Sequence, residues 1–341
     1  MKIIADAFGC DNPEAFVRGC ALALRKDASL SLVVAGDKQF IEKILKTEVF
    51  DASRLEILDA PEVITNDDVP TVAIRAKKNS SLVAAFERAK ADPEIAGMVS
   101  AGSTGAVLTG GLFKFGRIRG IDRPALAPVL PTRVEGKFAL LIDCGANVDC
   151  KPDYLAQFGM MGSIYMRAMF GLNAPKVALL SNGVEDKKGN VLNHNAFAKL
   201  KELNEKGIIN FVGNMEAREI LSGDYDVIVT DGFAGNVALK SLEGTANTVM
   251  SVLKEEVTKS FLSKLGALLM KKSLRALKRR MDYNRIGGAT LLGVEKVLVK
   301  AHGGSNATAI AAAIGQVKRM AELDVTAKIT DGLKGMGAYD L

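Results

Sequence analysis

Tryptophan is absent from this chain of 341 residues, and histidine and cysteine are scarce. The two histidines, His194 and His302, stand far apart, and the four cysteines form no CxxC pair, so the sequence contains no zinc-ligand spacing. Aromatic residues make up only 6% of the chain, which argues against a surface on which single-stranded nucleic acid stacks its bases. We therefore expect reduced, mostly buried thiols and no nucleic-acid partner.

Long apolar runs are missing as well. No uncharged apolar run approaches the roughly 18 residues that a membrane-spanning helix requires. The opening stretch "MKIIADAFGC" becomes acidic and glycine-bearing within a few residues, unlike a secretory leader. We expect a cytoplasmic globular protein, because 48% of the side chains are hydrophobic and the chain is long enough to bury a large core.

Positive charge is concentrated in one segment. Ten of the 45 lysines and arginines fall between residues 254 and 285, together with three of the 39 acids, so this segment carries +7. The rest of the chain carries −1, against +6 for the whole. The segment is therefore interpreted separately from the body.

The body contains short apolar runs rich in Val, Ile and Leu, which alternate with helical patterns and mostly end in a small, polar, glycine-containing turn. This alternation predicts an α/β fold whose sheet is mostly parallel and covered on both faces. Such sheets bind ligands at the carboxyl edge, where these turns would lie side by side. The eight candidate strands with their turns are "KIIADAFG", "SLVVAG", "GMVSAGSTG", "FALLIDCGAN", "KVALLSNG", "INFVGN", "DVIVTDGFAGN" and "KVLVKAHGGSN".

The turn within "SAGSTGAVLTGG" offers amides and hydroxyls but no titratable group. Gly102, Ser103, Thr104 and Gly105 follow a predicted strand and precede a helical pattern, so they should form a helix N-terminus suited to an anion such as phosphate. The alternative is an ordinary helix cap with glycines that permit close packing. Four further turns have a similar composition, namely "DCGAN", "SNGVEDKKGN", "DGFAGN" and "HGGSN". No strand is followed by GxGxxG, so a nicotinamide cofactor is not expected.

Seven motifs, in order along nearly the whole chain, resemble the bacterial phosphate acyltransferase of phospholipid synthesis. That family moves a fatty acyl group from acyl carrier protein to inorganic phosphate, and the acyl phosphate then serves the downstream membrane glycerol-3-phosphate acyltransferase. The resemblance implies a three-layer αβα fold related to phosphate acetyltransferase and isopropylmalate dehydrogenase, a homodimer, no metal cofactor, and peripheral attachment to the inner face of the membrane. The motifs are "DAFGCDNP", "SAGSTGA", "GIDRPALAPVLPT", "LIDCGANVDCKP", "GNMEAREIL", "DGFAGNVALKSLEG" and "GGATLLGVEKVLVKAHGGSN".

Three positions depart from the family pattern. Asp11 and Asn12 stand where the family commonly has an Asp-His pair, which removes a possible proton carrier. Cys10 replaces a common second glycine, and Ser103 stands where Asn is frequent.

Phosphate attack on a thioester needs a held phosphate, a stabilised carbonyl oxygen and a leaving thiolate, so donors matter more than a general base. We place phosphate on Ser103, Thr104 and Gly105, helped by Lys187 or Lys188, whose alternative is a solvated loop face. The remaining predicted substrate-binding residues lie in the same turns: Gly102, Asn182, Gly183, Asp231, Gly232, Gly235, Ser305 and Asn306.

Three residues are predicted to take part in the chemistry: Lys187, Asn236 and His302. Asn236, like Asn182, is a candidate oxyanion or phosphate donor, or else a structural turn residue. His302 would protonate the thiolate or bind phosphate, or else serve the structure. A covalent cysteine intermediate at Cys144 or Cys150 is rejected, since no basic cluster neighbours them. For Asp143, Asp149 and Asp231 we expect capping and loop bonding rather than metal binding.

The basic segment reads as two short amphipathic helices with a bend near residues 270–272, inserted at 251–285 into a single α/β catalytic domain of residues 1–341. Apolar and basic residues together favour an anionic lipid surface. The alternatives are a helix pair in the dimer interface, or docking of acidic acyl carrier protein by the same charges or by Arg117, Arg119 and Arg123. The predicted lipid-facing residues are Phe261, Leu262, Leu265, Leu268 and Leu269 on one face, and Leu274 and Leu277 on roughly the opposite one.

Two other functions stay open. One is a phosphate acetyltransferase that uses coenzyme A, which the basic amphipathic segment disfavours. The other is a non-catalytic membrane adaptor on the same fold, which the number of polar strand-end turns disfavours.

Overall fold

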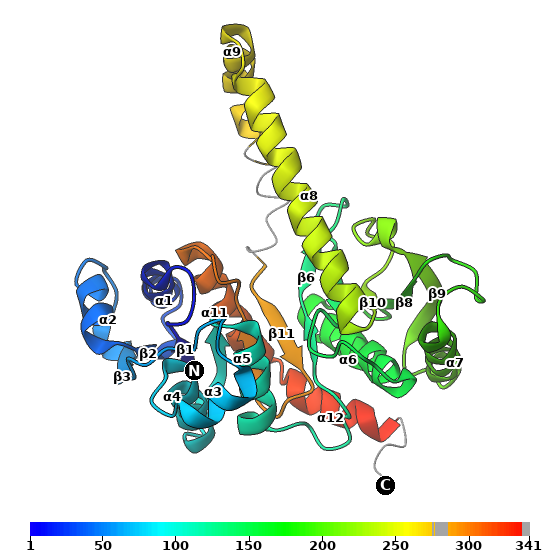
Figure 1. Cartoon of the computed structure of the whole chain (residues 1–341), viewed down its shortest axis with the longest axis horizontal. Coiled ribbons are helices and arrows are strands. Elements are labelled where there is room, and N and C mark those ends of the chain that lie inside the picture. Colours follow the sequence, from blue (N-terminus) through cyan, green and yellow to red (C-terminus); the bar gives the residue numbers. More distant parts are fainter. Residues whose placement is uncertain (275, 277–285, 336–341) are drawn as a thin grey trace.

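A computed structural model gives the arrangement of the chain and describes residues 1–274, 276 and 286–335. The strands form two sheets that lie side by side (Figure 1). The first sheet runs in the order β3 (Leu55–Asp59), β2 (Ser31–Gly36), β1 (Lys2–Asp6), β4 (Ile95–Ser100), β12 (Val297–Lys300), β11 (Ala289–Leu292) and β5 (Ala125–Ala127). The second runs in the order β6 (Val129–Pro131), β7 (Phe138–Ile142), β10 (Val227–Val229), β8 (Lys176–Ser181) and β9 (Asn210–Glu216).

Both sheets are mostly parallel, which confirms the predicted fold class. Only β11, β5 and β6 pair antiparallel among the described strands. The expectation of one sheet was wrong, because the chain changes sheets at Pro128, between two strands of three residues each. Proline offers no N–H to a ladder, and no helix separates these two strands, so the alternation of strand and helix does not mark the change of sheet.

Helices cover both faces of each sheet. In the first sheet, Ile3 and Ala5 point toward α1 and α11, while Ile4 points toward α3, α4 and α5. In the second, α6, α7 and α12 cover one face and the first turns of α8 cover the other. These helices are α1 (Pro13–Lys26), α3 (Pro70–Ala76), α4 (Ser81–Ala91), α5 (Thr104–Gly110), α6 (Pro152–Phe170), α7 (Val191–Glu205), α8 (Gly232–Thr258), α11 (Ala307–Glu322) and α12 (Val325–Gly335).

The two sheets share one hydrophobic core. A single cluster of buried side chains includes β1 and β2 of the first sheet and β7, β8 and β10 of the second. Gln316 of α11 donates to the Tyr165 hydroxyl of α6 across this core, at 3.1 Å. The short elements α2 (Lys38–Leu45), η1 (Ala52–Arg54), η2 (Gly111–Phe115) and η3 (Ala217–Glu219) lie at its periphery.

A helical projection rises from the body. α8 starts against the second sheet, where Gly232 and Gly235 are buried, and continues outward to α9 (Phe261–Leu269) at the tip (Figure 1). α9 ends at Leu269 and residues 271–274 are again helical, which agrees with the predicted bend. Leu277 lies outside the described residues. Within the described ranges, none of the helices combines the length and apolar character that crossing a bilayer requires.

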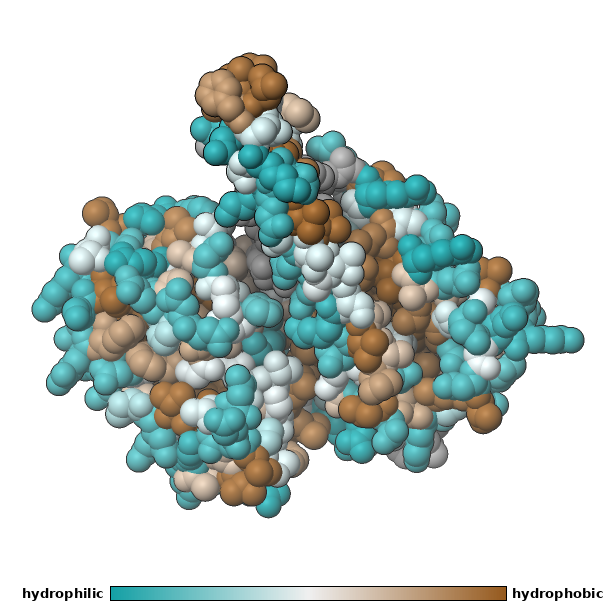
Figure 2. Space-filling model, turned by 45° about the horizontal axis from the view of Figure 1, so that its top comes forward, coloured by the Kyte–Doolittle hydropathy of each residue, from teal (hydrophilic) through white to brown (hydrophobic). Residues whose placement is uncertain are grey.

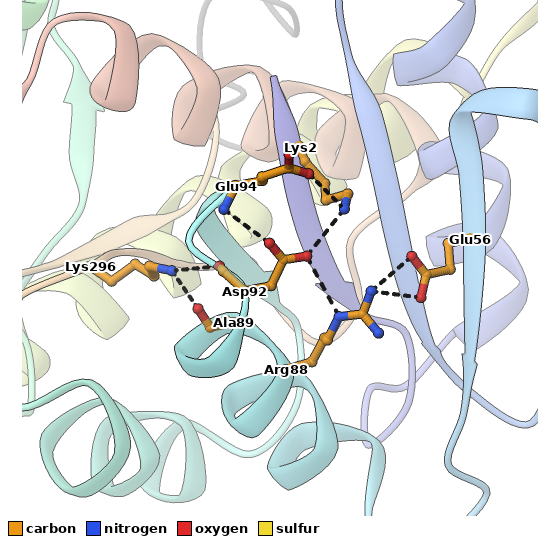
Figure 3. A network of polar contacts seen from close by, with 7 residues as sticks. All are labelled: Lys2, Glu56, Arg88, Ala89, Asp92, Glu94 and Lys296. Atoms are coloured by element: carbon orange, nitrogen blue, oxygen red, sulfur yellow. Dashed lines mark hydrogen bonds and ion pairs between the residues drawn. The ribbon is translucent and has the colours of Figure 1, made fainter.

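The amino edge of the first sheet is closed by charged side chains (Figure 3). Asp92 pairs with Lys2 at the start of β1, at 3.1 Å, and Arg88 pairs with Glu56 of β3 at 3.0 Å. Lys296 donates to the carbonyls of Ala89 and Asp92 at the end of α4, where a cation stabilises the helix dipole. The charged side chains at this edge are therefore paired with one another or with main-chain carbonyls.

Candidate functional site

The carboxyl edges of the two sheets meet around a cavity of about 120 Å³. That volume is several times the roughly 10–15 Å³ that one water molecule needs. The first turns of α8 form one wall, and β5, β6, β11 and the end of β12 form the others, together with residues that follow β4 and β7. Its polar and small lining residues are Thr104, Cys144, Asn236, Lys240, Glu243, Gly287, Gly288, Lys300 and His302.

Lys300 is a buried cation in the cavity wall. It closes β12, its side chain is only 8% exposed, and its Nζ donates to the carbonyls of Ala101 and Ala301. Burial lowers the pKa of Lys300 to about 8. No carboxylate of the described residues lies within ion-pair distance of its Nζ. A buried lysine at a cavity without a carboxylate partner is a typical feature of a functional site.

A chain of hydrogen bonds joins the end of β1 to the end of β4, the strand next to β12. Asp6, at the end of β1, accepts from the Ser100 hydroxyl at 2.6 Å, and Ser100 in turn accepts from the Gly102 amide at 3.1 Å. Burial raises the pKa of Asp6 to about 6, while its hydrogen bond with Ser100 acts in the opposite direction. The chain fixes the start of the predicted phosphate turn.

Only part of that turn reaches the cavity. Gly102 and Ser103 are buried, Gly105 is half-buried, and Thr104 is exposed and lines the cavity. Ser103 occupies the cap position of α5, but its side chain makes no capping hydrogen bond. Thr104 is therefore the residue of this turn that a cavity ligand would contact.

The turn after β7 supports α8. Asp143 accepts hydrogen bonds from the amides of Leu126, Ala146 and Asn147 and from the Asn147 side chain, at 2.7–3.1 Å. Burial raises the pKa of Asp143. Asp143 thus bonds its own loop, as expected.

Two predicted glycines bring α8 onto this turn. A Cβ on Gly235 would stand 1.9 Å from the Asp143 carbonyl oxygen, and one on Gly232 would stand 2.6 Å from that of Asn147. Asp231 caps α8 by accepting from the Ala234 amide at 2.8 Å. This close approach holds Asn236 at the cavity wall.

His302 lies exposed at the cavity, and its Nδ1 accepts from the Gly304 amide at 3.2 Å. In the neutral ring this assigns the proton to Nε2. Ser305 is buried, and Asn306 caps α11 by accepting from the Ala309 amide at 2.9 Å. Asn12, which replaces the family's histidine, caps α1 in the same way.

A second, larger and mostly apolar cavity of about 800 Å³ lies on the other side of α8. Asn182 and Asp231 line it, together with Phe233 and Val237. α8 therefore separates the predicted site residues into two groups, with Thr104, Asn236 and His302 around the small cavity.

The loop that carries the predicted lysines folds on itself. Asn182 accepts from the Gly189 amide at 2.9 Å, and the Lys188 stem packs where a Cβ on the buried Gly183 would stand. Lys187 and Lys188 are exposed and line neither of these cavities. Lys300 was not predicted as a site residue, yet it is the buried cation in the wall of the small cavity.

The three predicted docking arginines are exposed at the opposite edge. The main chain of Arg117 pairs with that of Val294, in the turn that precedes β12, as an isolated antiparallel β-bridge. The Arg117 guanidinium donates to the Asp122 carbonyl. Arg119 and Arg123 lie in the same exposed loop. This loop is at the amino edge of the first sheet, whereas the small cavity is at the carboxyl edge.

All four cysteines are free thiols. Burial raises the pKa of Cys10 to about 11 and that of Cys150 to about 12, and it also raises the pKa of Cys144. A thiol with a raised pKa is a poor nucleophile at neutral pH.

Comparison with known proteins agrees with this architecture. Residues 1–328 match the family model described as "Fatty acid synthesis protein". The chain is 47% identical over 317 residues to a phosphate acyltransferase of Clostridioides difficile, covering 93% of this chain and 91% of that protein. It is also 47% identical over 341 residues to a phosphate acyltransferase of Oceanobacillus iheyensis, covering 100% and 99%.

Solved structures share the fold at low sequence identity. A phosphotransacetylase from Staphylococcus aureus superposes with a TM-score of 0.60 at 16% identity, covering 95% of this chain and 94% of that one. A phosphotransacetylase from Streptococcus pyogenes gives 0.59 at 19% identity, covering 99% and 94%. The fold is thus common to both groups, while identity over nearly the full length assigns this chain to the phosphate acyltransferase family of enzymes.

Proposed function

We propose that this enzyme transfers a fatty acyl group from acyl carrier protein to inorganic phosphate and that the acyl phosphate supplies phospholipid synthesis. The observation that carries the proposal is the small cavity. It offers a buried cation and side-chain donors at the meeting of two sheets, while Cys144 in its wall has a raised thiol pKa. Such a lining suits an anionic nucleophile that the protein binds, rather than one that it supplies.

The transfer needs no covalent enzyme intermediate. A phosphate oxygen attacks the thioester carbonyl carbon, the new C–O bond forms, and the carbonyl oxygen takes up negative charge. The C–S bond then breaks, and the thiolate leaves with the electron pair and takes a proton from His302 or from water. Asn236 and Thr104 line the cavity and would donate to the charged oxygens, and one such donor is worth roughly 2.7–4 kcal/mol in other enzymes.

The donor is identified by a direct assay. The protein is incubated with phosphate and palmitoyl acyl carrier protein, palmitoyl coenzyme A or acetyl coenzyme A, and hydroxylamine traps the acyl phosphate as a hydroxamate. We expect product with the palmitoyl carrier protein at the highest kcat/KM. Faster turnover of acetyl coenzyme A would replace the proposal by a phosphate acetyltransferase, and no product from any donor would favour the adaptor.

We also propose that α9 attaches the protein to an anionic membrane surface. Phe261 and Leu269 are about four-fifths exposed, at 80% and 82%, and Leu262, Leu265 and Leu268 are exposed beside them. Figure 2 shows these apolar side chains gathered at the tip of the projection. Lysines flank them, and each basic residue near such a surface contributes up to about 1 kcal/mol.

A homodimer is proposed along α8. Phe233, Val237, Val249 and Val252 are more than half exposed, and at about 100° per residue Val249 and Val252 lie on one side of the outer half of the helix. Exposed apolar residues at both the inner and the outer part of a helix are unusual for a surface that faces only water. For acyl carrier protein, the lysines of the projection lie on the same side of the molecule as the cavity and are the favoured docking charges over Arg117, Arg119 and Arg123.

A further inference from the structure

We propose that Lys300 is the residue that binds the attacking phosphate, and that Asp6 and Ser100 are positioning residues that hold it toward the cavity. The inference rests on the proposed function for the identity of the anion, and it names the residue that recognises it. It stands on the burial of Lys300, on its place in the cavity wall and on the hydrogen bonds that fix the neighbouring turn.

The ammonium group of Lys300 is incompletely satisfied. It has three N–H donors, and main-chain carbonyls of Ala101 and Ala301 accept from it. Neutral acceptors do not compensate the cost of burying a full charge, which is recovered when an anion binds beside it. We therefore expect the Lys300 ammonium group to bind an anionic ligand in the cavity that it lines.

Other charges around the cavity do not supply that anion. Lys240 and Glu243 of α8 pair with each other at 2.8 Å and so cancel. On the β1 side, Cys10, Asp6 and Asp11 act on Lys300 only from beyond ion-pair distance, and Asp6 is bonded to Ser100. Across the cavity lie Cys144, which burial keeps protonated, and His302.

Lys300 and the glycine turn are held together. The Ala101 carbonyl accepts from Lys300, and the next amide, that of Gly102, donates to Ser100 and through it reaches Asp6. Two strand ends, those of β1 and β12, therefore fix one turn between them. Thr104 follows two residues later and faces the same cavity, so cation and hydroxyl are kept in one arrangement.

The test measures phosphate binding without any acyl donor. Inorganic phosphate is titrated calorimetrically into the full chain and into the variants Lys300→Met, Lys300→Arg and Lys296→Met at pH 7. We expect Lys300→Met to weaken phosphate binding about tenfold or more and Lys300→Arg to restore most of it, because a charged hydrogen bond is lost and then replaced. Lys296 is the matched control, since it also donates to two carbonyls but at the amino edge of the sheet.

The outcomes separate a binding role from a structural one. If Lys300 only supports the turn, Lys300→Met lowers the melting temperature while the folded protein binds phosphate as the wild type does, and the inference is overturned. If Lys300→Met does not fold, the test compares the pH dependence of phosphate affinity in the wild type and in Lys300→Arg. Wild-type affinity for phosphate should fall by up to tenfold per pH unit above about 8 as Lys300 loses its proton, whereas the Arg variant should stay constant. Equal pH dependence in both proteins would also overturn it.

Failure of the proposed function is visible separately. Phosphate binding that depends on Lys300 with no acyl phosphate from any donor would contradict the acyl transfer and leave this assignment standing. Acyl phosphate formation with an unchanged KM for phosphate in Lys300→Met would support the acyl transfer and contradict the role of Lys300.

Discussion

At the residue scale, Asp6 is a buried group beside the site whose ionisation is costly. It is fully buried, and its pKa is raised from 3.8 to about 6, so the folded state prefers the protonated form. The stability that proton uptake provides is complete below pH 3.8 and lost as the pH rises through about 6. At neutral pH the ionised Asp6 therefore destabilises the fold, and its retention there is consistent with the positioning role.

The first prediction is that Asp6→Asn stabilises the protein and harms the site. The free energy of unfolding at pH 7 should rise by up to about 3 kcal/mol, and this gain should disappear below about pH 4. The KM for phosphate should rise, since the carboxylate that holds Ser100 and the glycine turn is replaced by a weaker, neutral acceptor. Urea unfolding at several pH values measures the first effect, and a stability change that is independent of pH would contradict it.

The second prediction concerns the thiol in the cavity wall. Cys144→Ala should leave kcat close to that of the wild type, because burial raises the pKa of Cys144 and the proposed mechanism has phosphate attack the thioester directly. The variant is assayed for acyl phosphate, and intact-mass spectrometry looks for an acyl adduct on the wild type. Loss of turnover together with such an adduct would show that cysteine carries the acyl group.

Sequence reasoning reached only part of this site. Thr104, Asn236 and His302 were predicted, because polar residues after apolar strands mark a sheet edge. Lys300 was overlooked, although a lysine that closes the apolar run "KVLVK" is itself a signal. The sequence could not predict that α8 separates the site residues into two cavities, because the side of a helix on which a turn lies depends on tertiary packing.

At the element scale, all eight predicted strands are present in the structure. Four others were not predicted, namely β3, β5, β6 and β11. β5 and β6 are separated only by Pro128, and β11 is followed by β12 after a short turn, so none of the three shows the alternation of strand and helix on which the prediction relied. β3 is an edge strand whose residues are exposed or half-buried, so its sequence lacks the apolar run of the central strands.

The third prediction belongs to α9. Changing Leu268 and Leu269 to Glu should abolish sedimentation with anionic vesicles, because each leucine loses roughly 1.5–3 kcal/mol of apolar burial and negative charge is added. The variant should remain folded and should turn over acyl carrier protein normally in solution.

A matched control changes Lys187 and Lys188, on an exposed loop away from α9, to Glu. Its membrane binding should be reduced far less than that of the leucine variant. Equal sedimentation of wild type and leucine variant would exclude α9 as the membrane contact, whereas an unfolded or dissociated variant would place these leucines in an interface.

At the scale of the whole molecule, the fourth prediction tests the dimer. Val249→Glu and Val252→Glu place two charges on one exposed side of the outer half of α8, so the double variant should elute as a folded monomer in light-scattering chromatography. The change is on the surface of one protomer, so the melting temperature should fall only if the interface is lost. A variant that stays dimeric would show that another surface joins the protomers.

The length of α8 also fixes the distance between the small cavity and the tip of the projection. It runs without a break from Gly232 to Thr258, so Asn236 and the outer end lie about 33 Å apart along the helix axis at 1.5 Å per residue. If α9 rests on lipid with α8 upright, the reaction takes place that far above the headgroups. This distance is close to the diameter of a small domain, so a carrier protein of that size has room to approach the cavity while the enzyme stays attached, and the acyl phosphate must then travel down the length of α8 to reach the bilayer.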